Sequence, residues 1–182
     1  MPVPDPDRAA PRLTLVLGGA RSGKSRYAEG LIEALPGPWL YVATAQAWDD
    51  EMRARIAEHR ARRPAPWETV DAPRDLASVI RRAPAGRPVL VDCLTLWLTN
   101  AMLDEDADLA AERDALVESC RTAAGPMVLV SNEVGLSIVP ENALARRFRD
   151  EAGRLHQRLA AMADRVVLVV AGLPMILKGE AR

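Results

Sequence analysis

The stretch that decides the fold reads Leu13-Thr-Leu-Val-Leu-Gly-Gly-Ala-Arg-Ser-Gly-Lys-Ser25. An apolar, β-prone run breaks into glycines and then opens a helix, and the pattern G-x-x-x-x-G-K-[ST] is completed by Gly18, Gly23, Lys24 and Ser25. Glycines let the backbone approach a ligand closely, and successive N–H groups at a helix N-terminus face an anion. In this motif Lys24 reaches the β- and γ-phosphates and the Ser25 hydroxyl ligates Mg²⁺. The alternative is a glycine-rich turn that only joins a strand to a helix, but the complete motif in this context predicts a nucleoside triphosphate site.

The composition is that of one globular domain. The chain has 182 residues, 49% of them hydrophobic and only 4% aromatic, so Ala, Leu and Val fill most of the predicted core. We expect a flexible N-terminal tail over residues 1–11 and a single nucleotide-binding domain over 12–182. The net charge of −1 gives no indication of nucleic acid or a membrane surface as the main partner. No apolar run is long enough to span a membrane, and residues 1–11 do not resemble a signal peptide, so we expect a cytoplasmic protein.

The two cysteines, Cys93 and Cys120, fall in a strand pattern and a helix pattern. Their spacing is typical neither of a metal site nor of a disulfide framework. We therefore expect two buried free thiols.

Strand and helix patterns alternate along the chain. Short runs that are apolar throughout predict buried strands, and the helix patterns between them end at Pro or Gly. The predicted strands after the first are 39–43, 67–70, 89–93, 127–131 and 165–171, and a short tail follows. The predicted helices are 24–34, 49–62, 74–82 (opened by Pro73), 94–103, 109–123 and 143–163. This order predicts an α/β fold with a mainly parallel sheet covered by helices on both faces.

Asp92 ends the predicted strand 89–93 downstream of the glycine-rich loop. In proteins that bind nucleoside triphosphates, an acid at this place commonly holds Mg²⁺ or its waters. The alternative is an N-cap for the helix that follows, because Asp is a frequent capping residue.

A basic face with an imidazole lies on the predicted helix 49–62 and its exit. The four side chains that share this face through their i, i+4, i+7 and i+8 spacing are Arg55, His59, Arg62 and Arg63. Such a face could hold a polyphosphate, and a neutral imidazole could attack phosphorus. A solvated helix face is the simpler alternative. The second histidine, His156, lies in a long helix pattern and is interpreted as structural.

A third polar stretch, residues 131–142, follows a strand of the same predicted sheet. It leaves at the edge where ligands bind in such folds, and its polar groups are Asn132, Glu133, Glu141 and Asn142. A plain connecting loop is the alternative.

Together these stretches resemble one family, the bifunctional adenosylcobinamide kinase/adenosylcobinamide-phosphate guanylyltransferases of adenosylcobalamin synthesis. Besides the glycine-rich loop, the resemblance rests in order on Tyr41-Val-Ala-Thr44, Asp50-Glu-Met52, Arg55-Ile56, His59, Arg63-Pro64, Trp67, Leu98-Thr-Asn100, Val130-Ser-Asn-Glu-Val-Gly135, Val139-Pro-Glu-Asn142 and Arg146-x-Phe-Arg-Asp150. It covers nearly the whole chain beyond residue 11.

The resemblance implies a RecA-like P-loop fold, two reactions and a homotrimer. ATP or GTP phosphorylates adenosylcobinamide, and GTP then transfers GMP to adenosylcobinamide phosphate through a guanylylated histidine. The nucleophile of the family falls on His59, with Lys24 in the shared P-loop. Mg²⁺ would be held by Ser25 and Asp92. The nucleotide contacts map onto Gly18, Gly19, Ala20, Arg21, Ser22, Gly23, Lys24, Ser25, Thr44, Ala45, Gln46, Arg60, Ala61, Arg62, Arg63, Asp71 and Asp92.

The chain departs from this pattern in two ways. Asp71 and Asp92 stand where some members carry Glu, which keeps the charge and shortens the reach. Glu58 stands where some members have a second His beside the nucleophile. No residue stands out as the base for the phosphorylation. The rival hypotheses are a P-loop small-molecule kinase without the guanylyl step and a nucleotide-binding regulatory module.

Overall fold

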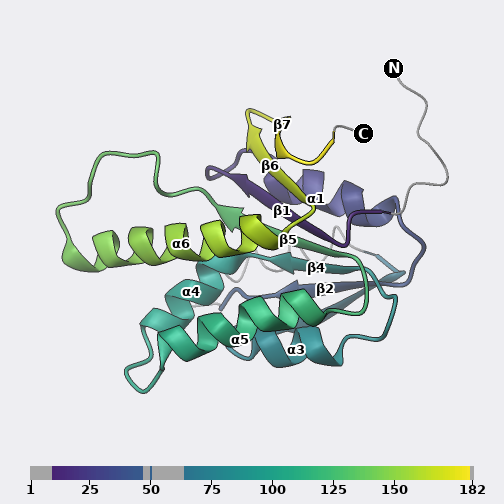
Figure 1. Ribbon diagram of the computed structural model, residues 1–182, viewed down its shortest axis with the longest axis horizontal. Coiled ribbons are helices and arrows are strands. Elements are labelled where there is room, and N and C mark those ends of the chain that lie inside the picture. Colours follow the sequence, from purple (N-terminus) through teal and green to yellow (C-terminus); the bar gives the residue numbers. More distant parts are fainter. Residues whose placement is uncertain (1–9, 47–49, 51–63, 181–182) are drawn as a thin grey trace.

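The computed structural model describes residues 10–46, 50 and 64–180 (Figure 1). Over these residues a seven-stranded sheet forms the middle layer. Its strands are β1 (Leu13–Gly18), β2 (Trp39–Ala43), β3 (Trp67–Asp71), β4 (Val89–Asp92), β5 (Met127–Asn132), β6 (Arg165–Val170) and β7 (Leu173–Lys178). Their order is β3-β2-β4-β5-β1-β6-β7, and every neighbouring pair is parallel except β6 and β7.

Helices cover both faces of this sheet. The described helices are α1 (Lys24–Glu33), α3 (Leu76–Arg82), α4 (Leu94–Met102), α5 (Leu109–Thr122) and α6 (Ala143–Met162). In Figure 1, α1 lies on one face, and the other four lie on the opposite face. The predicted mainly parallel α/β fold is therefore confirmed, with shifts of a residue or two at the element ends.

The core follows from the apolar strands. In β1, Leu15 and Val16 are both fully buried, yet they belong to two different hydrophobic clusters. Successive side chains of a strand point to opposite faces, so an apolar run without alternation fills both layers. One layer packs against α1, and the other packs against α3 to α6. Packing on both faces of the sheet thus fixes the positions of the strand ends, where the candidate site lies.

Helix α3 begins later than the sequence pattern predicts. Pro73 was expected at the first helical position, but the helix starts at Leu76. The carbonyl of Pro73 accepts a hydrogen bond from Asn100 Nδ2 at 2.9 Å, and the carbonyl of Arg74 accepts one from Trp97 Nε1 at 2.9 Å. Both donors lie on α4. These tertiary hydrogen bonds hold the two residues in a non-helical segment.

The predicted short tail after residue 171 is wrong, because this segment forms the strand β7. Val170 pairs with Leu173 across a two-residue turn in which Ala171 and Gly172 have φ values of 51° and 81°. Two positive φ values match the twist of a tight antiparallel hairpin. Pro174 is tolerated because β7 is the edge strand of the sheet.

Two predictions fall largely on residues that are not described. The helix predicted over 49–62 lies outside the described residues except for Asp50, and the tail predicted over 1–11 does so except for Ala10 and Pro11. Both stay predictions. None of the helices within residues 10–46 and 64–180 combines the length and apolar character needed to cross a membrane.

Candidate nucleotide-binding site

The glycine-rich loop joins β1 to α1 at the carboxyl edge of the sheet. Its backbone turns through Arg21 at φ 56° and Gly23 at φ 93°, and Gly23 is the N-cap of α1. Gly18 has no room for a side chain, since an added Cβ would lie 2.5 Å from Ser22 Oγ and 2.6 Å from the carbonyl oxygen of Val169. The loop can therefore close tightly over the strand only with glycine at this position.

Lys24 is held across the loop. Its side chain is largely buried, and Nζ donates a hydrogen bond to the carbonyl oxygen of Gly19 at 3.1 Å. No side chain caps the N-terminus of α1. The first N–H groups of a helix have no partner within it, so the loop offers an ammonium group together with backbone donors. Ser25 follows in the first turn of the same helix.

The turn between β6 and β7 supports this loop from the side. The N–H of Gly172 donates to the carbonyl of Ser22 at 2.8 Å. A Cβ on Gly23 would lie 3.3 Å from the Cα of Gly172. The β6–β7 hairpin thus fixes Ser22 and Gly23, the last residues before α1. The prediction of a short tail after residue 171 gave no reason to expect this contact.

The strand order places the end of β5 beside the P-loop. β5 lies between β4, which ends at Asp92, and β1, which leads into the P-loop. Immediately after β5, the N–H of Glu133 donates to the carbonyl oxygen of Gly18 at 3.0 Å. The predicted position of the polar stretch 131–142 at the ligand-binding edge is therefore confirmed for its first residues.

Asp92 does not cap α4. The N-cap is Cys93, which makes no side-chain capping bond, while Asp92 Oδ2 accepts a hydrogen bond from the Tyr41 hydroxyl at 3.1 Å. Asp92 is only half-buried. The carboxylate is thus oriented by the neighbouring strand β2 and stays accessible at the edge.

A buried polar network joins the carboxyl ends of β2 and β4. Thr44 Oγ1 donates to the carbonyl of Cys93 at 2.6 Å and accepts from its N–H at 2.8 Å. Asn100 Nδ2 donates to the carbonyl of Thr44 at 2.9 Å. On the neighbouring strand, Asn132 Nδ2 donates to Thr95 Oγ1 at 2.8 Å. Because these side chains bond to neighbouring segments of the chain, the network fixes the end of β4. It therefore fixes the position of Asp92 relative to the P-loop.

The Cys93 thiol is buried at the end of β4, next to Asp92. Burial raises the pKa of Cys93, the carboxylate of Asp92 raises it further, and the ammonium of Lys24 lowers it. Lys24 begins α1 directly after the P-loop and Asp92 ends β4, so both residues lie at the carboxyl edge of the sheet.

A second buried polar network joins the end of β5 to α6. Ser131 Oγ and His156 Nε2 are 2.7 Å apart, and His156 Nδ1 lies 3.8 Å from Glu133 Oε2. Burial lowers the pKa of His156, and the charge of Glu133 partly opposes that shift. His156 is therefore a buried residue of α6 that joins the helix to the strand end, in agreement with its structural interpretation.

The remaining predicted contacts divide into three groups. Thr44, Ala45 and Gln46 follow β2 at the same edge, and Thr44 is buried in the network above. Asp71 ends β3 at the far side of the sheet and is exposed. The nucleophile candidate and its basic neighbours, His59, Arg60, Ala61, Arg62 and Arg63, lie outside the described residues.

Sequence reasoning gave no site role to Cys93 or Thr95 and missed Gly172. The signal for Thr95 was a polar residue in the first turn of a mostly apolar helix, directly after the strand that ends at Asp92. Gly172 carried no comparable signal, because Ala-Gly is an uncommon hairpin turn beside the usual Asn-Gly and Asp-Gly. Of the polar groups in 131–142, Asn142 instead caps α6, since its Oδ1 accepts from Leu144 N and Ala145 N.

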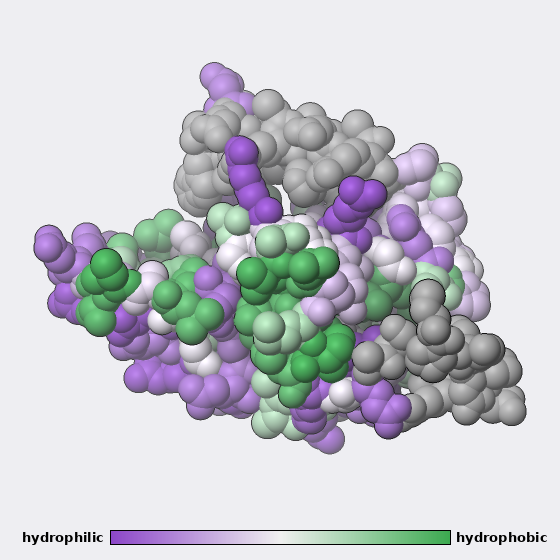
Figure 2. Space-filling model, turned by 90° about the horizontal axis from the view of Figure 1, so that it is seen from above, coloured by the Kyte–Doolittle hydropathy of each residue, from purple (hydrophilic) through white to green (hydrophobic). Residues whose placement is uncertain are grey.

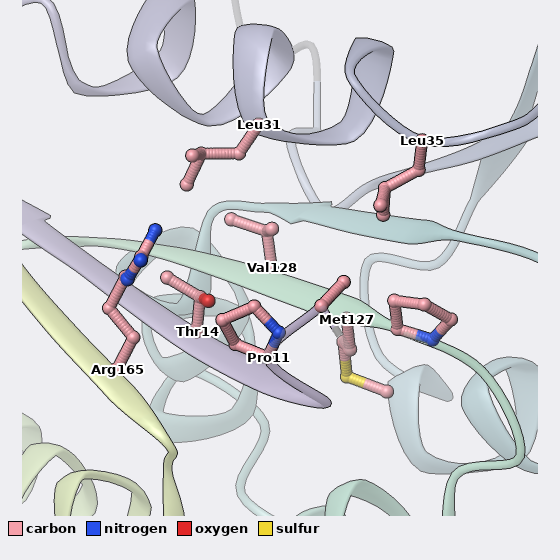
Figure 3. A pocket seen from close by; sticks show the side chains of 9 residues that line it. Pro11, Thr14, Leu31, Leu35, Met127, Val128 and Arg165 are labelled. Atoms are coloured by element: carbon pink, nitrogen blue, oxygen red, sulfur yellow. The ribbon is translucent and has the colours of Figure 1, made fainter. Parts of the chain in front are cut away.

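A small cavity lies at the opposite, amino end of the strands (Figure 3). Figure 3 shows Leu31 of α1 and Leu35, just after that helix, pointing toward Val128 and Met127 at the start of β5, with Arg165 at one side. The cavity is mostly apolar, and its residues belong to none of the loops described above. It is therefore separate from the candidate site.

The fold and the site define a P-loop nucleotide-binding protein of RecA-like architecture. Two solved structures share the fold at low sequence identity. The flagellar accessory protein FlaH from Methanocaldococcus jannaschii has a TM-score of 0.50 at 12% identity, with 93% of this chain and 79% of that chain covered. An ATPase from the type III secretion system of pathogenic bacteria has a TM-score of 0.52 at 11% identity, with 91% and 56% covered.

The chain belongs to the family described as cobinamide kinase / cobinamide phosphate guanyltransferase, whose model matches residues 14–177. It is 57% identical to a bifunctional adenosylcobalamin biosynthesis protein, CobP, of Pseudomonas aeruginosa, over 91% of this chain and 97% of that protein. It is 46% identical to the bifunctional protein CobU of Salmonella typhimurium, over 91% and 99% of the two chains. The predicted family is therefore confirmed, and an enzyme is favoured over a regulatory module.

Proposed function

We propose that this protein phosphorylates adenosylcobinamide with ATP or GTP and then transfers GMP from GTP to adenosylcobinamide phosphate, giving adenosylcobinamide-GDP and pyrophosphate. The observation that carries the proposal is a complete P-loop, across which Lys24 bonds to Gly19, within a chain that matches this family over residues 14–177. We assign both reactions to one domain, residues 12–182. Because both consume nucleoside triphosphates, we place them in the cytoplasm.

In the first reaction the P-loop would steer the γ-phosphate. Phosphoryl transfer requires positioning and charge neutralisation above all. Lys24 sits at the mouth of the loop with backbone donors around it, and it would leave the Gly19 carbonyl to contact the phosphates. The hydroxyl of Ser25 and the carboxylate of Asp92 are hard oxygen donors of the kind that Mg²⁺ prefers. Mg²⁺ held by them would neutralise charge on the β- and γ-phosphates.

In the second reaction the same loop would hold the leaving pyrophosphate. We propose that His59 attacks the α-phosphorus of GTP, so that a P–N bond forms as the P–O bond to pyrophosphate breaks. The phosphate of the corrinoid then displaces His59. The basic residues Arg60, Arg62 and Arg63 would neutralise the transferring group, and Asp71 and residues 44–46 would contact the guanine nucleotide. The support for His59 is its place in the family motif.

Covalent labelling tests this assignment. The protein is incubated with Mg²⁺ and GTP labelled at the α-phosphate, without corrinoid, and acid-labile label on the protein is counted. We expect label on the wild type and on the neighbouring variant Glu58→Ala, and none on His59→Ala. Label retained on His59→Ala would refute the nucleophile. An unlabelled wild type that still phosphorylates adenosylcobinamide would identify the kinase without the guanylyl step.

We also propose that the protein is a homotrimer. Large apolar side chains are exposed on two surfaces, and Figure 2 shows hydrophobic residues gathered over β7 and along the loop from β5 to α6. The exposed large apolar residues on these two surfaces are Leu136, Ile138, Val139, Leu144, Val170, Leu173, Met175 and Leu177. Exposed apolar surface on an edge strand is typical of an interface between chains. Light scattering should give three times the mass of one chain, and a monomer would refute the proposal.

A further inference from the structure

We propose that Glu133 is the catalytic base of the phosphorylation step, accepting the proton of the corrinoid hydroxyl as that oxygen attacks the γ-phosphorus. This proposal rests on the kinase function proposed above and deepens it. Three observations carry it: the position of Glu133 beside the P-loop, the way its carboxylate is held, and its place among the other acids of the same edge.

The first observation is position. In the parallel pairing of the central strands, Asp92 lies opposite Val130 and Gly18 lies opposite Asn132. Glu133 therefore lies one residue beyond the level of Gly18 and three residues beyond the level of Asp92, on the strand that separates the proposed Mg²⁺ ligand from the first residue of the P-loop. The 3.0 Å bond from its N–H to the carbonyl of Gly18 fixes its backbone to that loop. Ligands of such sheets bind at this place.

The second observation is how the carboxylate is held. Glu133 Oε1 accepts a hydrogen bond from the N–H of Gly135 at 2.6 Å. Oε2 faces His156 Nδ1 at 3.8 Å, beyond hydrogen-bond length, and the side chain keeps 22% of its surface exposed. His156 is itself fixed by Ser131 at 2.7 Å. One oxygen is thus anchored while the carboxylate remains open to a substrate, and His156 is a positioning residue behind it.

The third observation is the set of acids that end or follow strands at this edge within the described residues. Asp92 is assigned to Mg²⁺ and accepts a hydrogen bond from Tyr41. Asp71 lies on β3, at the far side of the sheet from β1. Glu133 follows the strand adjacent to β1, so it is the acid best placed to face the γ-phosphate.

The proton balance separates the two reactions. In the first, the substrate O–H loses its proton to Glu133, an O–Pγ bond forms, the bond from Pγ to the bridging oxygen breaks, and the nucleoside diphosphate leaves. The proton then passes to water. In the second, the corrinoid attacks with a phosphate oxygen that carries no proton. Glu133 should therefore matter for the first reaction far more than for the second.

The test measures both reactions on the same variants. Phosphorylation is followed with γ-labelled ATP and adenosylcobinamide, and guanylyl transfer with α-labelled GTP and adenosylcobinamide phosphate. Glu133→Gln keeps the hydrogen-bond acceptor for Gly135 but cannot take a proton. We expect kcat of phosphorylation to fall by about 10²-fold or more, with a fall in guanylyl transfer at least tenfold smaller. The exposed Glu105→Gln makes the same charge change and should leave both rates at the wild-type level.

Two further variants distinguish a loss of the proton acceptor from a loss of structure. Glu133→Asp retains a carboxylate at shorter reach and should recover part of the kcat lost in Glu133→Gln. His156→Gln should lower kcat of phosphorylation with little change in KM for ATP, and should add almost nothing to Glu133→Gln in the double variant. Equal losses in the two reactions, or no recovery with Asp, would overturn the proposal. A wild type without phosphorylation would instead refute the kinase function itself.

Discussion

The tight packing around Gly18 leads to a sharp prediction about the P-loop. In Gly18→Ala the new methyl group would lie 2.5 Å from Ser22 Oγ and 2.6 Å from the carbonyl oxygen of Val169. The first neighbour can rotate away, but the second is backbone of a buried strand and cannot. Overpacking of this kind costs about 1–3 kcal/mol. For a chain of this size that lowers Tm by roughly 2–12 °C.

The adjacent glycine supplies the control. A Cβ on Gly19 would meet nothing within 4 Å. Both variants are unfolded by urea and by heat without nucleotide, so that phosphate contacts do not enter the comparison. We expect Gly19→Ala to unfold like the wild type and Gly18→Ala to unfold earlier with an unchanged m-value. Gly18→Ala should also bind a fluorescent GTP analogue more weakly, because the loop must open to relieve the clash.

A wild-type unfolding midpoint in Gly18→Ala would refute this reasoning, because it would mean that the strand end yields to a methyl group. Equal destabilisation by the two variants would refute it as well. In that case the loss of unfolding free energy would come from replacing any glycine of the loop by alanine, and not from a contact with Val169.

Three more predictions concern Lys24, the two cysteines and His156. Lys24→Ala should slow both phosphorylation and guanylyl labelling by at least about 10²-fold, because one loop serves both, and undiminished labelling would contradict the shared site. Burial raises the pKa of Cys93 and raises the pKa of Cys120 to about 12, so neither thiol should react with a disulfide reagent at pH 8 until urea unfolds the chain. Because burial lowers the pKa of His156 below 6.5, the native state resists protonation; unfolding free energy should fall as pH drops below about 6.5, and less steeply in His156→Gln.

Patterns within a few residues predicted most of the fold. The apolar strands, the breaks at Pro and Gly, and the complete motif over residues 13–25 each depend on local sequence, and the structure has these elements almost where the patterns end. The start of α3 was missed because it is decided by Trp97 and Asn100, donors more than twenty residues away. β7 was missed because its turn, Ala171-Gly172, has Ala where such turns usually have Asn, Asp or Gly.

The site shows the same division. The P-loop and Asp92 could be predicted because motif spacing and strand ends define them. The supports of the site could not, since the bond from Gly172 to Ser22 and the contact between Ser131 and His156 join segments with no shared pattern. Even the family resemblance, which indicated His59, gave no reason to single out Glu133. That reason came from the strand order, which is a property of the whole sheet.

The strand order also sets when the P-loop can form. The two partners of β1 are β5 and β6, which follow it by more than a hundred residues, so Leu13 must wait for Met127, and Thr14 for Arg165. Pairings so distant in sequence make folding slow and leave partly made chains with exposed apolar strands. A chain without β6 would leave Gly18 without its pairing partner Val169, which packs against the P-loop. We therefore expect a chain truncated before β6 to bind GTP more weakly than the chain that contains it.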